Sequence, residues 1–341
     1  MNELLVRDAT EADLPEITAW LARSQRPAAT LPQTPDERLL VAEMAGPPSG
    51  PGAAAGRLLA SVRLRPVIGV VLPRAWYHVG VTVHAAAELQ LFHRQRTLLL
   101  GNDHTGASEL ADLVCAHEAS DDGHSLPLAM QAAALREVLL TALLVMASRR
   151  IRYAGTLIAE LPGLRDGAGQ SPFWHGLGRH FYSGDPALAA IRHGDAWRCH
   201  VAALLPRQPV TTAFLPAAAQ AAIAQVAPSS RLQCELLETC GLRYSHHVSV
   251  HDGGPVLEAD LDALPAVTGS RSWRLAEGDG PGLQASICLL LSEDADGRLC
   301  ALRAAVSPLG SRLQIGVAAR ARLRLAPGDT VWALPLQDEA G

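Results

Sequence analysis

The sequence predicts an α+β fold in which strands and helices share one layered structure, with a small β-rich region at the C-terminal end. Residues 59–65 alternate between apolar and polar side chains, as a half-buried strand does. Residues 128–147 form one long apolar stretch of helical composition. Residues 287–291 and 299–306 are strand-like runs joined through Asp296-Gly297, a favourable hairpin turn. This order of elements is typical of α+β proteins, and further strands are expected at residues 76–84, 109–115, 155–161 and 330–334.

The N-terminal segment is expected to hold one short strand and two helices. Residues 6–10 are strand-like, and Thr10 can cap a helix over residues 11–22, with Asp13 placed three residues on to reach back to it. A second helix fits residues 35–44. The Gly- and Pro-rich residues 45–52 can continue neither helix nor strand, so a surface loop is expected there.

The apolar stretch 126–147 has the length of a membrane span. Gln131, Arg136 and Glu137 interrupt it, and charged groups are costly at the centre of a bilayer. A buried helix that crosses the sheet explains this stretch better, so no membrane association is expected.

Composition limits the function to a few classes. All 29 basic residues are arginine, because the chain contains no lysine, and this excludes a lysine Schiff base or a phosphate-binding lysine of the Walker type. The formal net charge of -5 provides no basic field for a nucleic-acid backbone. Small molecules are therefore the expected ligands.

The six cysteines form no C-x-x-C pair, and several lie in apolar stretches, so they are expected to be reduced and structural. Residues 1–8 lack the basic start and long apolar region of a secretion signal. Both observations favour a cytoplasmic location.

Polar residues are concentrated at positions 101–110, directly after an apolar run. From spacing alone they predict a turn, capped by Asn102 and Asp103, in which His104 is a hydrogen-bonded structural histidine. The alternative is that they line a ligand pocket, where His104 can relay a proton near neutral pH.

Several motifs give the chain a resemblance to a known family. The most specific are the unbroken N-D-H-T-G-x-S-E-L of residues 102–110 and S-P-F-W of residues 171–174. With them, the chain resembles the arginine N-succinyltransferases, acyl-CoA transferases of the GNAT superfamily. Further matching stretches are Val79-Gly80, Val83-His84-Ala85, Ala159-Glu160, Leu177-Gly178, Phe181, Gln220, Gln225-Val226, Leu236-Leu237-Glu238, Gly241, Arg243-Tyr244 and Asp252-Gly253-Gly254-Pro255.

The resemblance implies both a fold and a reaction. The fold is a GNAT-like mixed sheet flanked by helices over residues 1–200, completed by a second α/β segment over residues 201–270 and followed by the β-rich residues 271–341. The reaction moves a succinyl group from succinyl-CoA to the α-amino group of L-arginine, or of ornithine in some members, with no permanently bound cofactor. A homodimer, or a heteromer with a similar subunit, is implied as well.

The resemblance also places the CoA site. The strand at residues 109–115 would splay away from its neighbour, and the succinyl-CoA contact falls on Leu113, whose exposed backbone can pair with the pantetheine amides. The pyrophosphate loop aligns with residues 120–125, where only Gly123 of the family's glycines is present and two aspartates occur.

The proton donor of the family is a histidine in Q-V-H-P, and this chain has Ala227 there. An alanine cannot transfer a proton, so His104 and Glu160 are candidates for the catalytic role, with His84 as a more distant one. The alternative is a catalytically weak paralogue that acts as the partner subunit of an active enzyme.

The resemblance favours a binding role for the residues of the polar turn. Asn102, Asp103 and Glu109 would line the acceptor pocket and attract the cationic groups of arginine. Arg179 would meet a carboxylate such as the succinyl tail. His175 and His180 share no helix face and have no carboxylate at ligand spacing, so no metal site is expected, and Phe173, Trp174 and Phe181 are interpreted as core residues.

Overall fold

The computed structural model describes residues 4–44, 56–116, 126–194, 196–278, 280 and 285–336. Its strands form one continuous mixed sheet, in the order β12-β15-β11-β14-β13-β1-β2-β3-β6-β7-β10-β9-β4-β5-β8. The protein is therefore α+β, as the sequence predicts. The strands from the N-terminal side to β10 are β1 Leu4–Asp8, β2 Arg38–Met44, β3 Arg57–Arg65, β4 Trp76–Ala86, β5 Leu91–Gly101, β6 Ser108–Cys115, β7 Thr156–Glu160, β8 Val210–Thr211, β9 Arg243–Ser249 and β10 Pro255–Asp260.

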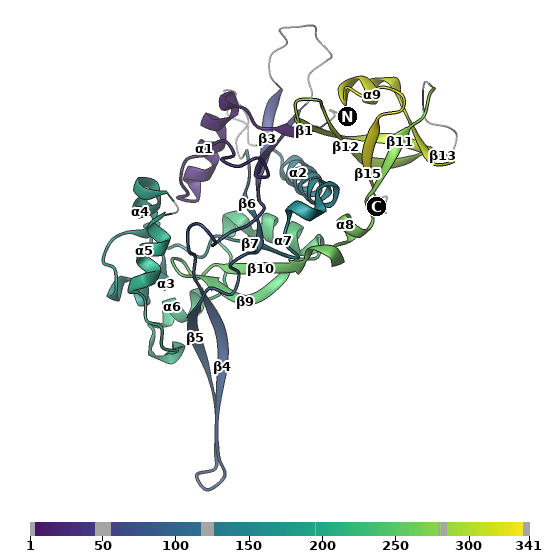
Figure 1. Ribbon diagram of the computed structural model, residues 1–341. Helices are drawn as coiled ribbons and strands as arrows, with labels where there is room; N and C mark the ends of the chain where they lie inside the picture. Colours follow the sequence, from purple (N-terminus) through teal and green to yellow (C-terminus); the bar gives the residue numbers. More distant parts are fainter. Residues whose placement is uncertain are drawn as a thin grey trace.

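The long helix α2, Leu128–Ser148, lies in the centre of the molecule (Figure 1). It contacts β2, β3 and β6, and the side chains from Val138 to Ala147 are all buried. Its length and hydropathy would suffice to cross a membrane, but 67% of its most apolar window is buried inside the protein. The prediction of a core helix across the sheet is confirmed.

The other helices are short, and α3 to α6 gather at the end of the molecule opposite the C-terminal strands (Figure 1). Phe173 and Trp174 of this group pack in a core that covers β4 and β9, as expected, whereas Phe181 is 42% exposed and not a core residue. The helices are α1 Leu14–Arg23, α3 Pro172–Gly176, α4 Pro186–His193, α5 Ala196–Leu204, α6 Ala217–Ala222, α7 Arg231–Thr239, α8 Pro265–Thr268 and α9 Val317–Arg322.

The C-terminal strands close into a small barrel. Each strand pairs with two others of the set, and the ring is completed by the β12–β13 hairpin that the sequence predicts around Asp296-Gly297. Leu290, Leu302 and Val331 fill the interior. The barrel continues the main sheet because β13 also pairs with β1. Its strands are β11 Arg271–Leu275, β12 Ser286–Glu293, β13 Leu299–Leu309, β14 Arg312–Ile315 and β15 Thr330–Pro335.

A long two-stranded ribbon formed by β4 and β5 extends away from the rest of the molecule (Figure 1). At its base, β4 pairs with β9 through Trp76–His78, and β5 pairs with β8 through Thr97 and Leu98. His84 lies on the exposed outer part of this ribbon. His84, the more distant candidate for the proton donor, therefore lies away from the centre of the sheet.

The N-terminal prediction is half right. Thr10 precedes a short 3-10 turn and then α1, and its backbone N–H donates to Asp13 Oδ2 at 2.6 Å, as expected. The predicted helix over residues 35–44 is wrong, because Arg38–Met44 is strand β2 between β1 and β3. Residues 39–42 are all at most 1% exposed, as expected for a central strand that is covered on both faces. The expected loop at residues 45–52 lies outside the described residues.

Candidate active site

The central feature of the site is a gap between two parallel strands. β6 and β7 pair only at Ser108–Leu157 and Glu109–Ile158 and then separate. A β-bulge follows in β6, because Asp112 and Leu113 together oppose the single residue Val62 of β3, and Asp112 has φ of 50°. Leu113 has no register partner on either neighbouring strand. The backbone at Leu113 therefore lies at an open edge inside the sheet.

A cavity of about 360 Å³ occupies this gap, and we call it the strand-gap cavity. Leu110 and Leu113 of β6 line one side, Leu161 and Pro162 after β7 line the other, and Leu237 of α7 contributes an apolar wall.

A second cavity of about 490 Å³ adjoins the first, and we call it the Arg165 cavity. The two share the end of β7 and the end of α1 as walls, through Ser24, Arg26, Glu160, Leu161 and Pro162. The second cavity is polar, and its remaining charged or hydrogen-bonding wall residues are Gln25, Arg165, Trp197, Arg198, Ser249, His251 and Asp252. Two cavities of different character thus meet where the strands separate.

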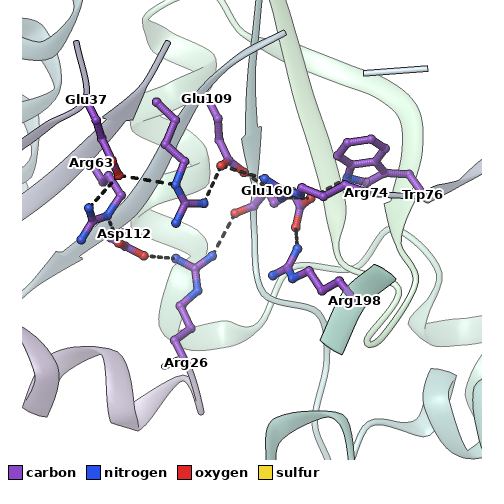
Figure 2. Close-up of polar contacts among 10 residues, drawn as sticks. Arg26, Glu37, Arg63, Arg74, Trp76, Glu109, Asp112, Glu160 and Arg198 are labelled. Atoms are coloured by element: carbon purple, nitrogen blue, oxygen red, sulfur yellow. Dashed lines mark hydrogen bonds and ion pairs between the residues drawn. The ribbon is translucent and has the colours of Figure 1, made fainter. Parts of the chain in front are cut away.

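Glu160 lies between the cavities with both carboxylate oxygens occupied (Figure 2). Arg74 and Trp76 donate to Oε1, each at 2.5 Å, and Arg198 donates to Oε2 at 3.1 Å. Burial raises the pKa of this carboxyl, but Arg74 and Arg198 outweigh burial and hold the pKa well below its usual range. Glu160 is therefore a fixed anion and a poor proton acceptor.

Glu109 is held in the same network. Arg74 donates to both of its oxygens at 2.9 Å, and Arg65 donates to Oε2 at 2.9 Å. Burial raises the pKa of Glu109, and the two guanidinium groups lower it to about 2. Its side chain is 3% exposed and lines neither cavity. Arg74, which joins the two glutamates, carries no motif that sequence reasoning could have recognised.

Arginines also fix the bulge in β6 (Figure 2). Asp112 accepts from Arg63 Nε at 2.7 Å and lies 3.6 Å from Arg26, whose guanidinium also donates to the backbone carbonyl of Glu160. Arg63 in turn pairs with Glu37 at 2.8 Å. These contacts span both edges of the gap and hold Arg26 at the junction of the two cavities.

The polar turn that follows β5 adjoins this network, because its His104 packs against Trp76. The carbonyl of Asn102 closes a turn with the N–H of Thr105, and both Asn102 and Asp103 are exposed. His104 is 3% exposed and packs against Trp76 and His247; burial, followed by His247, lowers its pKa to about 4. None of the three lines either cavity, so the turn interpretation describes the geometry of Asn102 and Asp103, whereas the buried Nε2 of His104 has no hydrogen-bond partner among the described residues.

His251 is a site residue that the sequence analysis missed. It lines the Arg165 cavity, and its Nδ1 lies 2.7 Å from Ser249 Oγ. Burial lowers its pKa to about 4, with Arg198 contributing in the same direction, so the imidazole is neutral at neutral pH. No local pattern marks this residue, because its neighbours in the cavity come from α1, β7 and α5.

Comparison with known proteins identifies the family. The family model described as arginine N-succinyltransferase beta subunit matches residues 53–266. Proteins named arginine N-succinyltransferase from Salmonella arizonae and Salmonella newport are 35% identical over 266 residues, which cover 77% of this chain and 74% of each relative. The chain belongs to the arginine N-succinyltransferase family.

The fold of this succinyltransferase family member is shared by a solved structure. The structure of arginine/ornithine succinyltransferase subunit AI from Pseudomonas aeruginosa superposes with a TM-score of 0.72. The match covers 99% of this chain and 100% of that chain at 22% sequence identity. The whole architecture, including the C-terminal barrel strands, is therefore comparable.

Ala227 and Gly123 stand at the two other positions for which the resemblance predicts a role in succinyl transfer. Ala227, at the position of the family histidine, donates its N–H to the carbonyl of Pro162 at 2.8 Å and precedes Ser230 of the strand-gap cavity wall. It therefore lies beside the gap without a titratable side chain. Gly123 and the rest of the expected pyrophosphate loop lie outside the described residues.

Arg179 lies away from both cavities of this succinyltransferase homologue. Its guanidinium is exposed and lies 3.1 Å from His175 Nδ1 within the same turn. Within the part of the chain that the structure describes, no group of three or more His, Cys, Asp or Glu side chains is arranged to hold a metal ion. The arginines that do line a cavity are Arg26, Arg165 and Arg198.

Proposed function

We propose that this protein transfers the succinyl group of succinyl-CoA to the α-amino group of L-arginine, with no permanently bound cofactor. Membership of the arginine N-succinyltransferase family supports an acyltransferase. The observation that carries the proposal is the open edge at Leu113 in the strand-gap cavity, which shares a wall with the polar Arg165 cavity. The curated relatives are named for the enzyme, which favours the transferase over a non-catalytic partner subunit.

The acyl donor belongs to the strand-gap cavity in this proposal. A splayed strand is the feature by which enzymes of the GNAT type bind acyl-CoA, and the free backbone at Leu113 offers its N–H and C=O to the amides of pantetheine. Leu110, Leu161 and Leu237 provide apolar walls for the aliphatic part of that arm. Gly123, which precedes α2 in the sequence, is the candidate contact for the pyrophosphate.

The amine acceptor belongs to the Arg165 cavity and reaches the thioester at the shared wall. The neutral amine nitrogen attacks the thioester carbon, the C–S bond breaks, and an amide bond forms. The proton that the nitrogen loses ends on the departing thiolate. His251 is neutral and lines the acceptor side, so it can carry this proton. The anion Glu160 and the more remote His104 are weaker candidates, and of the motif residues only Glu160 lines a cavity wall, because His104, Asn102, Asp103 and Glu109 line neither cavity.

The proposal extends to the surroundings of the enzyme. The matched family model and the solved neighbour are both described as subunits, which supports assembly as a homodimer or with a similar chain. Ornithine is an alternative acceptor, because it shares the α-amino group and is named with arginine in the name of the solved neighbour. A cytoplasmic location agrees with six free cysteines.

A thiol-release assay tests the proposal. Purified protein is mixed with succinyl-CoA and either arginine or ornithine, free CoA is followed with a thiol reagent, and the product is identified by its mass. We expect thiol release that depends on the amino acid, and a product heavier by one succinyl group. If the protein showed no calorimetric binding of succinyl-CoA and no thiol release above the buffer control, that result would contradict a transferase.

A further inference from the structure

Arg165 has a fixed position at the wall of the polar cavity. It lies in the loop after β7, half-buried, and its Nη1 donates to the carbonyl of Gly169 at 3.1 Å. Asp166 holds this loop in shape, because its Oδ1 accepts from the backbone N–H groups of Ala168 and Gln170, each at 2.9 Å. Gln25 anchors the loop from the other side by donating to the same Gly169 carbonyl. The guanidinium is therefore held in place before any ligand binds.

The charge of Arg165 is not compensated by the protein. Within the part of the chain that the structure describes, no carboxylate lies within 4 Å of it. Glu160 is already occupied by Arg74, Arg198 and Trp76. The other acid of the cavity, Asp252, accepts from two backbone N–H groups, those of Gly163 and Gly254, each at 3.0 Å. A half-buried cation without a counter-ion is costly unless a ligand supplies the negative charge.

Other donors face the same cavity. The Trp197 indole N–H is buried and has no acceptor among the described residues, and the Ser249 hydroxyl is within reach of the cavity through its contact with His251. Arginine presents a planar fork of N–H groups that matches the two oxygens of a carboxylate. A rigid fork, an unused indole donor and a hydroxyl form a site for a planar anion.

We propose that the Arg165 cavity binds a carboxylate group of a substrate, with Arg165 as its principal partner. This inference rests on the proposed function, in which both substrates carry a carboxylate: the α-carboxylate of the amino acid and the terminal carboxylate of the succinyl group. The recognised chemistry is the same in both cases. Arg165 is thus a specificity-determining residue and not a proton-transfer group.

Binding and rate measurements with matched ligands test this inference. The wild type and Arg165→Gln are compared on arginine against agmatine, which lacks the α-carboxylate, and on succinyl-CoA against butyryl-CoA, which lacks the terminal carboxylate. Hydrogen bonds to charged groups suggest a loss of about 10- to 100-fold in affinity and in kcat/KM for the carboxylate-bearing member of one pair. We expect the partner ligand without the carboxylate to change by less than about twofold. The pair that responds identifies which carboxylate is bound.

Two controls make the outcome decisive. Arg207→Gln makes the same change at an exposed arginine that lines neither cavity and is expected to leave all values unchanged. Arg165→Lys keeps the charge without the fork and is expected to recover only part of the loss. Calorimetric binding needs no turnover. If the protein is inactive but its affinity for arginine or succinyl-CoA depends on Arg165, the transfer reaction is refuted and the carboxylate site is not. Equal changes for both members of each pair, or no change at all, would overturn the carboxylate site.

Discussion

Two groups of charged residues meet at the end of β7 and differ in whether their charges are compensated. In the first, Glu109 and Glu160 are surrounded by arginines that occupy every carboxylate oxygen. In the second, Arg165 faces a cavity with no carboxylate within 4 Å among the described residues, and His251 beside it is neutral. Compensated charges hold the strands and loops in position, whereas uncompensated ones are available to a ligand. A glutamate in a motif is therefore not by itself a sign of chemistry at its carboxylate.

The largest expected effect comes from removing a compensated charge. Glu160→Gln removes the carboxylate charge that Arg74 and Arg198 share, and breaking such a buried ion pair costs about 3–5 kcal/mol. We expect this loss in the free energy of unfolding, measured by urea denaturation. Asp262→Asn is the matched control, because the Arg150–Asp262 pair is exposed and screened by solvent and should contribute far less. Similar small losses for both variants would show that the ion pairs around Glu160 do not hold the strands and loops in position.

The next effect concerns the proton carrier on the uncompensated side. His251→Asn keeps a polar side chain but removes the titratable group, so we expect kcat to fall about 100-fold, the low end for loss of a general base. The pKa of His251 is lowered to about 4, so the group stays neutral, and wild-type kcat/KM should not fall on this account until the pH approaches 4. The measurement is a pH profile of thiol release for both proteins.

Two further variants make this result specific. His193→Asn, on the exposed face of α4, should leave the profile unchanged. His104→Asn tests the assignment made from the sequence: a larger fall in kcat there than in His251→Asn would move the proton carrier to the polar turn and reject the distinction drawn between the two groups.

The sequence was sufficient for the parts of this fold that local pattern determines. The alternation of residues 59–65 identified β3, the long apolar stretch 128–147 identified α2, and Asp296-Gly297 identified the barrel hairpin. The segment Arg38–Met44 was assigned to a helix because Leu, Ala, Glu and Met favour helices in isolation. Its burial between β1 and β3 overrides that preference.

The candidate site was predictable only in part, for a different reason. The motif residues Glu109 and Glu160 could be selected from the sequence, but their saturation by Arg74 depends on contacts 35 and 86 residues apart. Arg165 and His251 lie in loops without any periodic pattern, and they share a cavity only because β7 and β9 lie on either side of β10. No local signal could have paired them.

A smaller effect should separate the two cavities by ligand. Leu113→Trp adds bulk at the open edge and is expected to raise the KM for succinyl-CoA about tenfold while changing the affinity for arginine less than about twofold, because Leu113 lines only the strand-gap cavity. Steady-state kinetics with each substrate varied in turn provide the measurement. Leu113→Ala is the control, since a contact through the backbone survives removal of the side chain. A rise in the arginine KM instead would mean that the acceptor occupies the gap.

The smallest effect is expected at Ala227, the position where the resemblance places the family histidine. Ala227→His places an imidazole beside Pro162 at the gap, next to Ser230, where it could reach the thiolate side of the reaction. Because His251 already carries the proton in the proposed mechanism, kcat should rise by no more than a few-fold in the wild-type background. In the His251→Asn background the same change should recover a larger part of the lost rate, since the two imidazoles then serve one role from opposite walls. A large gain in the wild type with no recovery in His251→Asn would assign proton transfer to the strand-gap cavity. His251, like Glu160, would then have only a structural role.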